Sequence, residues 1–273
     1  MCGRYASSRR PEDLIEEFEV TDPRVDTPLL PDYNVAPTKE VYAVMERPPR
    51  DDKTAPPARQ LRVLRWGLVP SWAKDPSIGN RMINARMETV AEKPSYKRAF
   101  AVRRCLLPAD GYFEWYPTEQ KTKAGKPVKQ PFFIHPTDGG VLAMAGLYEI
   151  WKDPTRDDDD PDRFRWTCTV LTTDAEDSLG RIHDRMPMMV PPERWAQWLD
   201  PSISGKDELM SLLEPAAPGR LSAYPVSSLV SNVRNNGPQL LEPLPIDDLP
   251  PDVRGDLTDG SLGTLPDTLP FDA

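Results

Sequence analysis

Short stretches in the middle of the chain alternate between apolar and polar residues. A period of two is typical of strands that bury one face. The alternation and the β-branched and aromatic content predict seven strands, at residues 41–46, 61–69, 105–107, 111–116, 132–134, 141–147 and 166–172. Pro108 is expected to make a turn between two of these strands. Residues 48–59 are expected to form a loop.

Other stretches place apolar residues three and four positions apart, which predicts helices. These stretches are residues 11–19, 84–92, 192–199 and 206–213. Pro11 suits the first turn of its helix, because the amide hydrogen that proline lacks has no helical partner there. Strands and helices follow one another without a strand–helix–strand rhythm. The pattern therefore predicts an α+β fold: a single compact domain around a mainly antiparallel, barrel-like sheet.

The pattern changes after residue 245. Residues 246–273 are rich in Pro, Asp, Gly and Leu and show no periodicity. A segment of this kind offers too little regular apolar surface to offset the entropy that ordering would remove. We therefore predict one domain over residues 2–245 and a disordered acidic tail over residues 246–273.

Composition narrows the class of protein. The chain has 273 residues, 38% of them hydrophobic, and 33 prolines, which indicates irregular segments around a modest core. It contains no apolar run of about 18 residues, so no membrane segment is expected. Three cysteines and two histidines at wide spacing fit neither a disulfide framework nor a metal site. We expect no metal, no cofactor and a reducing cytoplasmic location.

Charge is unevenly distributed along the chain. The formal net charge is −9, yet residues 59–104 hold eleven basic residues against three acidic ones. Residues 241–273 hold eight acidic residues and one basic residue, and the loop at 152–164 is also acidic. A basic segment inside an acidic protein indicates either a surface that faces phosphates or arginines on a solvated face. Aromatic residues within the segment favour single-stranded nucleic acid, whose bases stack on rings.

The beginning of the chain carries a candidate nucleophile, Cys2. Removal of Met1 would leave a terminal cysteine with a thiol and an α-amino group on neighbouring carbons. Their pKa values lie near ~8.5 and ~8, so both groups are partly reactive at neutral pH. Such an aminothiol can attack an acyl carbon through sulfur, or capture an aldehyde as a Schiff base that closes to a thiazolidine. On these residues alone, an exposed and inert terminus is the favoured interpretation.

Few side chains are available for acid–base chemistry. His135 precedes a proline at the end of a predicted strand, which favours a structural role. His183 lies in a polar turn and is either a proton shuttle or a satisfied turn histidine. Glu114 has two aromatic residues on each side, so it is either buried with a raised pKa or turned toward water. Asn84 could orient a substrate oxygen, although capping of the following helix is favoured by its position.

Seven segments of the chain resemble the SRAP family, whose members bind abasic sites in single-stranded DNA and were first described as SOS-response-associated peptidases. The segments occur in the family's order and span nearly all of residues 2–240. They are Met1–Tyr5, Tyr33–Thr38, Trp66–Pro70, Ile83–Thr89, Asp110–Trp115, Ile182–Pro187 and Asn232–Asn235.

The resemblance implies a metal-free site in which Cys2 crosslinks to the aldehyde of a ring-opened abasic sugar. Asn84 is then expected to hold the sugar, and Glu114 and His183 to form the acid–base pair. Arg4 and Arg86 are expected to contact phosphates, and Trp72 to pack against a base. The full set of DNA-binding residues that the resemblance implies is Arg4, Asn34, Pro37, Trp72 and Arg86.

The implied partner is single-stranded DNA with an abasic site, bound by a monomer that is associated with the nucleoid if the source is bacterial. The implied activity is a single-turnover crosslink that shields the lesion in the DNA damage response, with possible lyase or autopeptidase chemistry. Three alternatives stay open. They are a cysteine peptidase with Cys2, His183 and Glu114 as a triad, an N-terminal-nucleophile amidohydrolase that uses Cys2, and a passive reader of modified bases.

Overall fold

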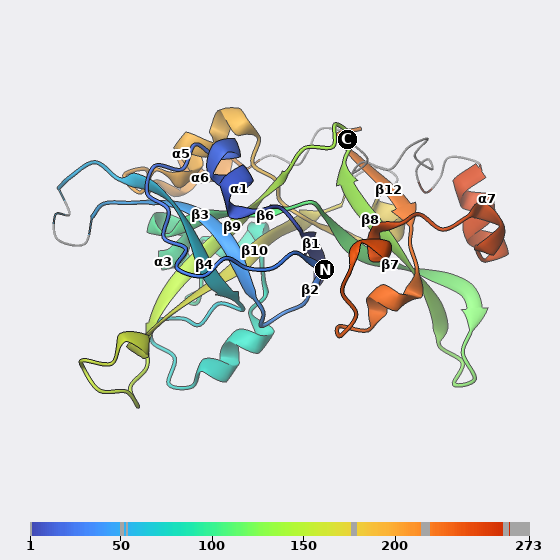
Figure 1. Ribbon diagram of the computed structural model, residues 1–273, viewed down its shortest axis with the longest axis horizontal. Helices are drawn as coiled ribbons and strands as arrows, with labels where there is room; N and C mark the ends of the chain where they lie inside the picture. The colour runs from blue at the N-terminus through green and yellow to red at the C-terminus, as the bar shows by residue number, and fades with distance from the viewer. Residues whose placement is uncertain are drawn as a thin grey trace.

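Five strands close into a barrel in the computed structural model, which describes residues 2–49, 52, 54–175, 179–213, 219–258 and 262 (Figure 1). These strands are β3 (Glu40–Arg47), β4 (Ala58–Trp66), β6 (Arg104–Ala109), β9 (Leu142–Lys152) and β10 (Phe164–Asp174). The ring closes because β10 pairs with β9 on one side and with β4 on the other. The β10–β4 pair is parallel and the other four pairs are antiparallel. The predicted α+β fold around a mainly antiparallel barrel is therefore confirmed.

Alternate side chains of the barrel strands point inward and fill the interior. Met45, Leu64, Leu107, Tyr148 and Cys168, one from each strand, belong to the same buried cluster. The barrel is therefore a packed core, and each strand presents its other face to a second layer of structure.

A second sheet of five antiparallel strands stands beside the barrel in the order β12–β8–β7–β1–β2. Its strands are β1 (Tyr5–Ser7), β2 (Asp32–Val35), β7 (Gly111–Lys121), β8 (Pro127–Pro136) and β12 (Leu221–Pro225). In Figure 1, β1 lies at the centre of the molecule, between the barrel and the long β7–β8 hairpin. The Tyr5 ring packs 5.2 Å from the ring of Trp66 at the end of β4, so the two sheets meet at β1.

Two short strands are paired to β10. Strand β5 (Asn84–Arg86) runs parallel to it, with Asn84 opposite Val170. Strand β11 (Arg185–Pro187) runs antiparallel to it, with Arg185 opposite Asp174. One end of β10 therefore positions two segments that lie far apart in the sequence.

The α-helices are α1 (Pro11–Glu17), α2 (Met87–Val90), α3 (Lys97–Val102), α4 (Leu179–Ile182), α5 (Trp195–Leu199), α6 (Lys206–Ser211) and α7 (Pro251–Thr258). Helices α1, α2, α3, α5 and α6 pack on the outside of the barrel, whereas α4 and α7 contact β7 of the second sheet. The 3₁₀ turns are η1 (Pro76–Arg81), η2 (Pro161–Arg163), η3 (Pro192–Arg194), η4 (Ser228–Ser231), η5 (Pro238–Leu241) and η6 (Ile246–Asp248). Phe18 and Trp195 pack ring to ring at 4.5 Å, and both belong to a buried cluster that includes Val44 of β3 and Leu106 of β6.

Two predicted elements differ from the structure. Residues 84–92 were expected to form one helix, but Asn84–Arg86 are a strand and only Met87–Val90 are helical. Pairing with β10 outweighs the weak local preference of this segment. Pro108, expected in a turn, lies within β6 instead, opposite Ala143 of β9.

The expectation of disorder after residue 245 is wrong for the residues that the structure describes there. Residues 246–248 form η6 and residues 251–258 form α7, which packs against β7. Val253 and Leu257 are buried in the same cluster as the barrel interior. Asp256 accepts a 2.9 Å hydrogen bond from the Tyr116 hydroxyl, which fixes the helix to β7. Residues 259–261 and 263–273 of the predicted tail lie outside the described residues.

Candidate functional site

The four predicted catalytic residues come from two sides of one junction. Cys2 lies three residues before β1 and Glu114 lies on β7, so the second sheet positions both. Asn84 begins β5, and His183 lies between α4 and β11, so both are held at β10. The antiparallel pairing of Tyr5 with Tyr112 continues as a hydrogen bond from the Phe113 amide to the Arg4 carbonyl, which leads Cys2 toward Glu114.

Cys2 is 0% exposed and lies among the side chains of the barrel core. Asn84 Nδ2 donates a 2.7 Å hydrogen bond to the carbonyl oxygen of Cys2, and this bond joins the two sides of the junction. Burial, and after it the negative charge of Glu114, raise the pKa of the Cys2 thiol above its usual value. The sulfur is therefore a neutral thiol at physiological pH, and it must lose a proton during any reaction in which it acts as a nucleophile.

Glu114 is 4% exposed, so the interpretation that it is buried is confirmed. Burial is the largest cause that raises the pKa of its carboxyl to about 7. A carboxyl with a pKa near the working pH can both donate and accept a proton, which is the property expected of a general acid–base group.

His183 faces Glu114 with one ring nitrogen. Its Nε2 lies 4.0 Å from Glu114 Oε2, and its Nδ1 accepts a 3.0 Å hydrogen bond from the Arg185 amide. The neutral ring carries a proton on one nitrogen and accepts through the other. Burial is the largest cause that lowers the pKa of His183, which favours this neutral form. Asp184 Oδ1 also lies 2.8 Å from Nδ1, on the solvent side.

Asn84 does not cap the helix that follows it, because the residue before α2 is Arg86 and no side chain caps that end. Within the described residues, the buried Oδ1 of Asn84 has no hydrogen-bond partner. A buried acceptor without a partner is uncommon and is energetically unfavourable. Asn84 therefore has one oxygen available for a hydroxyl of a ligand beside Cys2.

A cleft of about 510 Å³ opens above Glu114 and His183. Its other lining residues are Arg4, Trp115, Lys129 and Ser231. Trp115, Lys129 and Ser231 were not singled out from the sequence, because they lie on different elements and share no motif. The indole of Trp115 donates to the Ser231 hydroxyl at 3.0 Å, and the Arg4 guanidinium lies 5.6 Å from the Trp115 ring.

Arg4 and Asn34 form a connected pair in this structure. Arg4 Nη1 donates to Asn34 Oδ1 and to the Val230 carbonyl, each at 2.7 Å. Asn34 is fully buried, and its Nδ2 donates to the carbonyls of Val230, Asn232 and Asn235. The hydrogen bonds of its side chain are therefore made within the protein. Asn34 positions Arg4 and the loop at residues 230–235, and its side chain is not exposed to DNA.

The remaining predicted DNA-binding residues lie at the surface. Trp72 is 59% exposed, Arg86 is exposed at the end of β5, and Pro37 is half-buried in the turn after β2. Nothing in the described residues joins Trp72 or Pro37 to the four catalytic candidates by a hydrogen bond or a ring contact.

The basic segment at residues 59–104 does not form one phosphate-facing surface. Arg104 is buried and donates to backbone carbonyls, including that of Trp198 at 2.6 Å. Arg59 and Arg103 form ion pairs with Glu46 and Glu149. Positive charge in a stretch of sequence is therefore a poor guide to positive charge on one face of this fold.

Arg185 is a residue of the site that sequence reasoning missed, although it lies in the Ile182–Pro187 motif. Its guanidinium donates to Glu88 at 2.6 Å and to Asp174 at 2.5 Å, and its amide holds the His183 ring. The Arg185 amide therefore fixes the orientation of the His183 ring.

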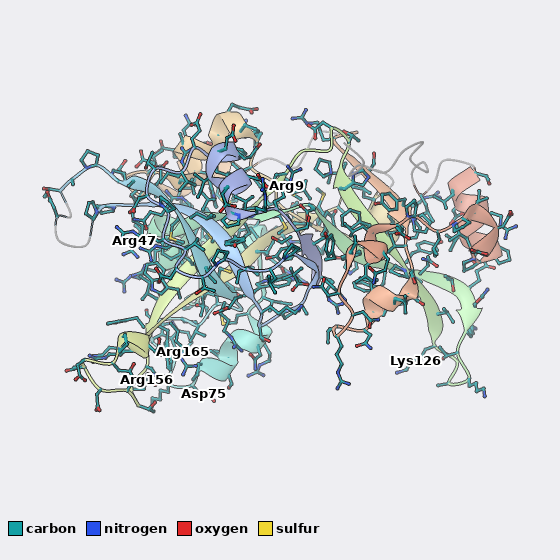
Figure 2. The ribbon with its side chains drawn as sticks, in the orientation of Figure 1. Arg9, Arg47, Asp75, Lys126, Arg156 and Arg165 are labelled. Carbon is teal, nitrogen blue, oxygen red and sulfur yellow. The ribbon has the colours of Figure 1, made fainter. Side chains whose placement is uncertain are left out.

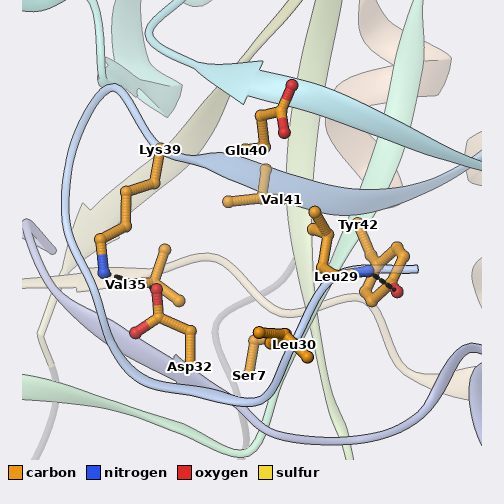
Figure 3. Close-up of a pocket in the computed structure, with 9 residues that line it drawn as sticks. All are labelled: Ser7, Leu29, Leu30, Asp32, Val35, Lys39, Glu40, Val41 and Tyr42. Carbon is orange, nitrogen blue, oxygen red and sulfur yellow. Dashed lines mark hydrogen bonds and ion pairs between the residues drawn. The ribbon is translucent and has the colours of Figure 1, made fainter. Parts of the chain in front are cut away.

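A smaller hollow of about 200 Å³ lies by β2 and β3 (Figure 3). It contains the ion pair of Asp32 with Lys39 at 2.6 Å, and none of the four catalytic candidates lines it. The described ranges contain no cluster of three or more residues suited to a metal ion. Among the helices of those ranges, none is long and apolar enough to cross a membrane.

The fold and site define an α+β protein with a closed barrel, a flanking antiparallel sheet and a cysteine-centred site at their junction. The chain belongs to the family described as SOS response associated peptidase (SRAP), whose model matches residues 1–233. The predicted family is therefore confirmed.

Curated relatives cover most of the chain. One is "Abasic site processing protein YoqW" of Bacillus subtilis (strain 168), 38% identical over 89% of this chain and 99% of its own. Another is "Abasic site processing protein YedK" of Escherichia coli (strain K12), 34% identical over 89% of this chain and 100% of its own. A crystal structure of a Bacteroides thetaiotaomicron protein has a TM-score of 0.72 and 25% identity, and the match covers 89% of this chain and 100% of that one.

Proposed function

We propose that this protein processes abasic sites by forming a covalent crosslink between Cys2 and the sugar aldehyde in single-stranded DNA. The observation that carries the proposal is the meeting of Cys2 with Asn84 and Glu114, which come from two different sheets. The names of the relatives support the substrate, because the curated proteins quoted above are abasic site processing proteins.

The chemistry begins with removal of Met1, which frees the α-amine of Cys2. The amine adds to the C1′ aldehyde of the open-chain sugar, and loss of one water gives an imine. The Cys2 sulfur then forms a bond to the carbon of this imine, which is protonated on nitrogen, and the thiol proton passes to a neighbouring base. The product is a five-membered thiazolidine. Both nucleophiles belong to one residue, so the second step is intramolecular and is favoured by proximity.

Glu114 moves the protons in this scheme. Its carboxyl, with a pKa of about 7, protonates the departing hydroxyl of the carbinolamine and then accepts the proton that the thiol must lose. His183, which lies beside Glu114, assists opening of the sugar ring at its ring oxygen. Asn84 Oδ1 accepts a hydrogen bond from a sugar hydroxyl.

Capture by sulfur also explains why the product protects DNA. An imine at C1′ acidifies the hydrogens at C2′ and so invites β-elimination, which breaks the strand. Closure to the thiazolidine removes the imine and with it this acidity. The proposed role is therefore a single-turnover shield of the lesion by a monomer, in a reducing compartment that keeps Cys2 as a thiol.

A cysteine peptidase is the second candidate, favoured by the family's description and by the nearness of His183 to Glu114. Two observations weigh against it. The pKa of the Cys2 thiol is raised, whereas peptidases of this kind need a thiolate. The ring of His183 is directed at Glu114 and at the Arg185 amide, and in a triad one ring nitrogen would serve the cysteine.

The test is incubation of the full-length protein with a single-stranded oligonucleotide that carries one abasic site, followed by a denaturing gel. We expect a slower band with wild type and with Cys168→Ala, and no such band with Cys2→Ala. Cys168 is a matched control, because it is equally buried and lies on β10. Intact-mass measurement of the free protein shows whether Met1 has been removed.

Two further variants separate chemistry from binding. Glu114→Gln and Asn84→Ala should slow crosslinking by roughly 10²-fold or more while binding to an intact single strand changes little. A wild-type protein that gives no covalent band, or peptide turnover that depends on Cys2, would overturn the proposal. If crosslinking and binding are lost equally, then Glu114 and Asn84 have a structural role and no role in the chemistry.

A further inference from the structure

The barrel has a second polar cavity at the end opposite Cys2. It measures about 630 Å³. Its lining residues include three arginines and two aromatic residues: Arg24, Arg47, Arg62, Phe164 and Trp166. Among the described residues that line it, none is acidic.

Strand register places this cavity at the mouth of the barrel. Trp166 pairs with Ile150 of β9 and has the same orientation as Cys168, which faces the core. Trp166 precedes Val170, the residue paired with Asn84, by four positions, which is about 13 Å of strand. In Figure 2, Arg47 lies on the barrel side of the molecule, far from Lys126 on the β7–β8 hairpin. The cavity and the Cys2 site are therefore separate.

The three arginines of this cavity have fewer acidic partners than positive charges. Arg24 pairs with Asp22 at 2.8 Å, and Arg62 donates its Nε hydrogen to Gln60 at 2.8 Å. In the described part of the chain, the guanidinium of Arg47 makes no hydrogen bond or ion pair and contacts the rings of Tyr148 and Trp166. The terminal nitrogens of Arg47 and Arg62 are thus available as donors.

The arginines of the cavity also repel one another. Burial, followed by the positive charges of Arg47 and Arg24, lowers the pKa of Arg62. Asp22 supplies one carboxylate near these three arginines, so positive charge remains in excess, and an anion bound between Arg47 and Arg62 relieves the repulsion. Guanidinium groups match phosphate oxygens with two parallel hydrogen bonds, so a phosphate is the anion best suited to them.

Aromatic side chains supply a wall for a planar group. The guanidinium groups of Arg62 and Arg47 lie 4.4 and 4.8 Å from the Trp166 ring, which fixes their positions. Phe164 is 47% exposed and Ile150 forms part of the same wall. The volume lies within the roughly 300–1,000 Å³ typical of small-molecule sites.

We propose that this cavity is a second binding site, for a nucleoside phosphate, with the phosphate on Arg47 and Arg62 and the base against Phe164. The ligand is either a free nucleotide or the phosphorylated end of a strand, because both present the same chemistry. This site is independent of the crosslinking proposed for Cys2.

The test is titration calorimetry of the full-length protein with dAMP, deoxyadenosine, inorganic phosphate and a 5′-phosphorylated tetranucleotide. We expect dAMP to bind more tightly than either of its parts. Arg62→Gln and Arg47→Gln should each weaken dAMP binding about tenfold, because each removes a charged donor pair. The matched control is Arg65→Gln, an exposed arginine on the same strand that does not line the cavity.

Thermal unfolding confirms that each variant is folded before it is titrated. Tighter binding of the tetranucleotide than of dAMP identifies a strand end as the source, and the reverse identifies a free nucleotide. The proposal is overturned if dAMP does not bind at millimolar concentration, if phosphate alone binds as tightly as dAMP, or if Arg65→Gln weakens binding as much as Arg62→Gln.

Discussion

At the scale of single residues, burial controls the chemistry of the candidate site. Cys2 and Glu114 are both almost inaccessible to solvent, and burial raises the pKa of each. The same cause lowers the pKa of His183. All three groups are therefore shifted toward their neutral forms, and a proton can pass among them without creating an isolated buried charge.

The raised pKa of Glu114 has a measurable consequence for stability. Its folded-state pKa of about 7 lies above the usual 4.5, so the folded state binds this proton more tightly than the unfolded state does. Stability should therefore fall as pH rises from about 4.5 to above 7, by on the order of 3 kcal/mol from this group. Glu114→Gln abolishes this titration, so the variant should gain stability relative to wild type with rising pH.

Urea unfolding at pH 5 and at pH 8 measures this difference. Glu119→Gln, an exposed glutamate on the same strand, is the control and should show no such gain. If the stability difference between Glu114→Gln and wild type is the same at both pH values, then ionisation of Glu114 does not destabilise the folded protein.

At the scale of elements, the sequence predicts the long strands well and the short ones poorly. Apolar residues over many positions identify β4, β9 and β10, because much of each strand is buried. Strands β1, β2 and β5 have three or four residues each, too few for a period to be recognised. These short strands hold or adjoin Cys2, Asn34 and Asn84, so local pattern alone cannot locate the site.

The site residues were nevertheless found in part. Residue type and setting made Cys2, Asn84, Glu114 and His183 candidates but left an inert or structural role open for each, and the resemblance to the family implied their roles. Arg185, Lys129 and Trp115 were missed because their roles depend on contacts between distant elements, such as Arg185 with Glu88. The C-terminal helix was missed for the same reason, since Val253 is buried only by a core that the rest of the chain builds.

Helix α7 predicts the result of a truncation. Removal of residues 246–273 exposes the core cluster that Leu249, Val253 and Leu257 cover. At about 1.5–3 kcal/mol for each of these three buried apolar side chains, the loss of stability should be on the order of 5–9 kcal/mol.

A chain that ends at Leu262 keeps α7 and serves as the control. Thermal unfolding compares the two truncations with the full chain. Equal unfolding temperatures for the chains that end at 245 and at 262 would mean that α7 contributes nothing to the stability of the domain.

At the scale of the whole molecule, one residue joins the two sheets. Trp66 ends β4, packs on Tyr5 at 5.2 Å and donates its indole hydrogen to the Ile83 carbonyl at 2.9 Å. Ile83 precedes Asn84, and Tyr5 lies three residues after Cys2. Trp66 therefore sets the distance between the two sides of the site without reaching the cleft.

Trp66→Phe should lower stability by about 1–3 kcal/mol and should also slow the proposed crosslinking, because Cys2 and Asn84 lose their common support. Trp151→Phe is a matched control. Trp151 is equally buried, and its indole donates to the Ala73 carbonyl at 2.7 Å, but it belongs to a different cluster. Crosslinking and urea unfolding of both variants test the idea, and equal slowing by the two substitutions would contradict it.

The contact between Arg4 and Val230 has a consequence for synthesis of the protein. Its 2.7 Å hydrogen bond joins residues 226 positions apart, and the cleft also contains Ser231. A ribosome releases Val230 long after Cys2, so the nascent chain carries its N-terminal segment for most of translation before this wall of the cleft can form. Until then Cys2 has the pKa of an ordinary exposed thiol, and the burial that raises this pKa comes only with completion of the domain.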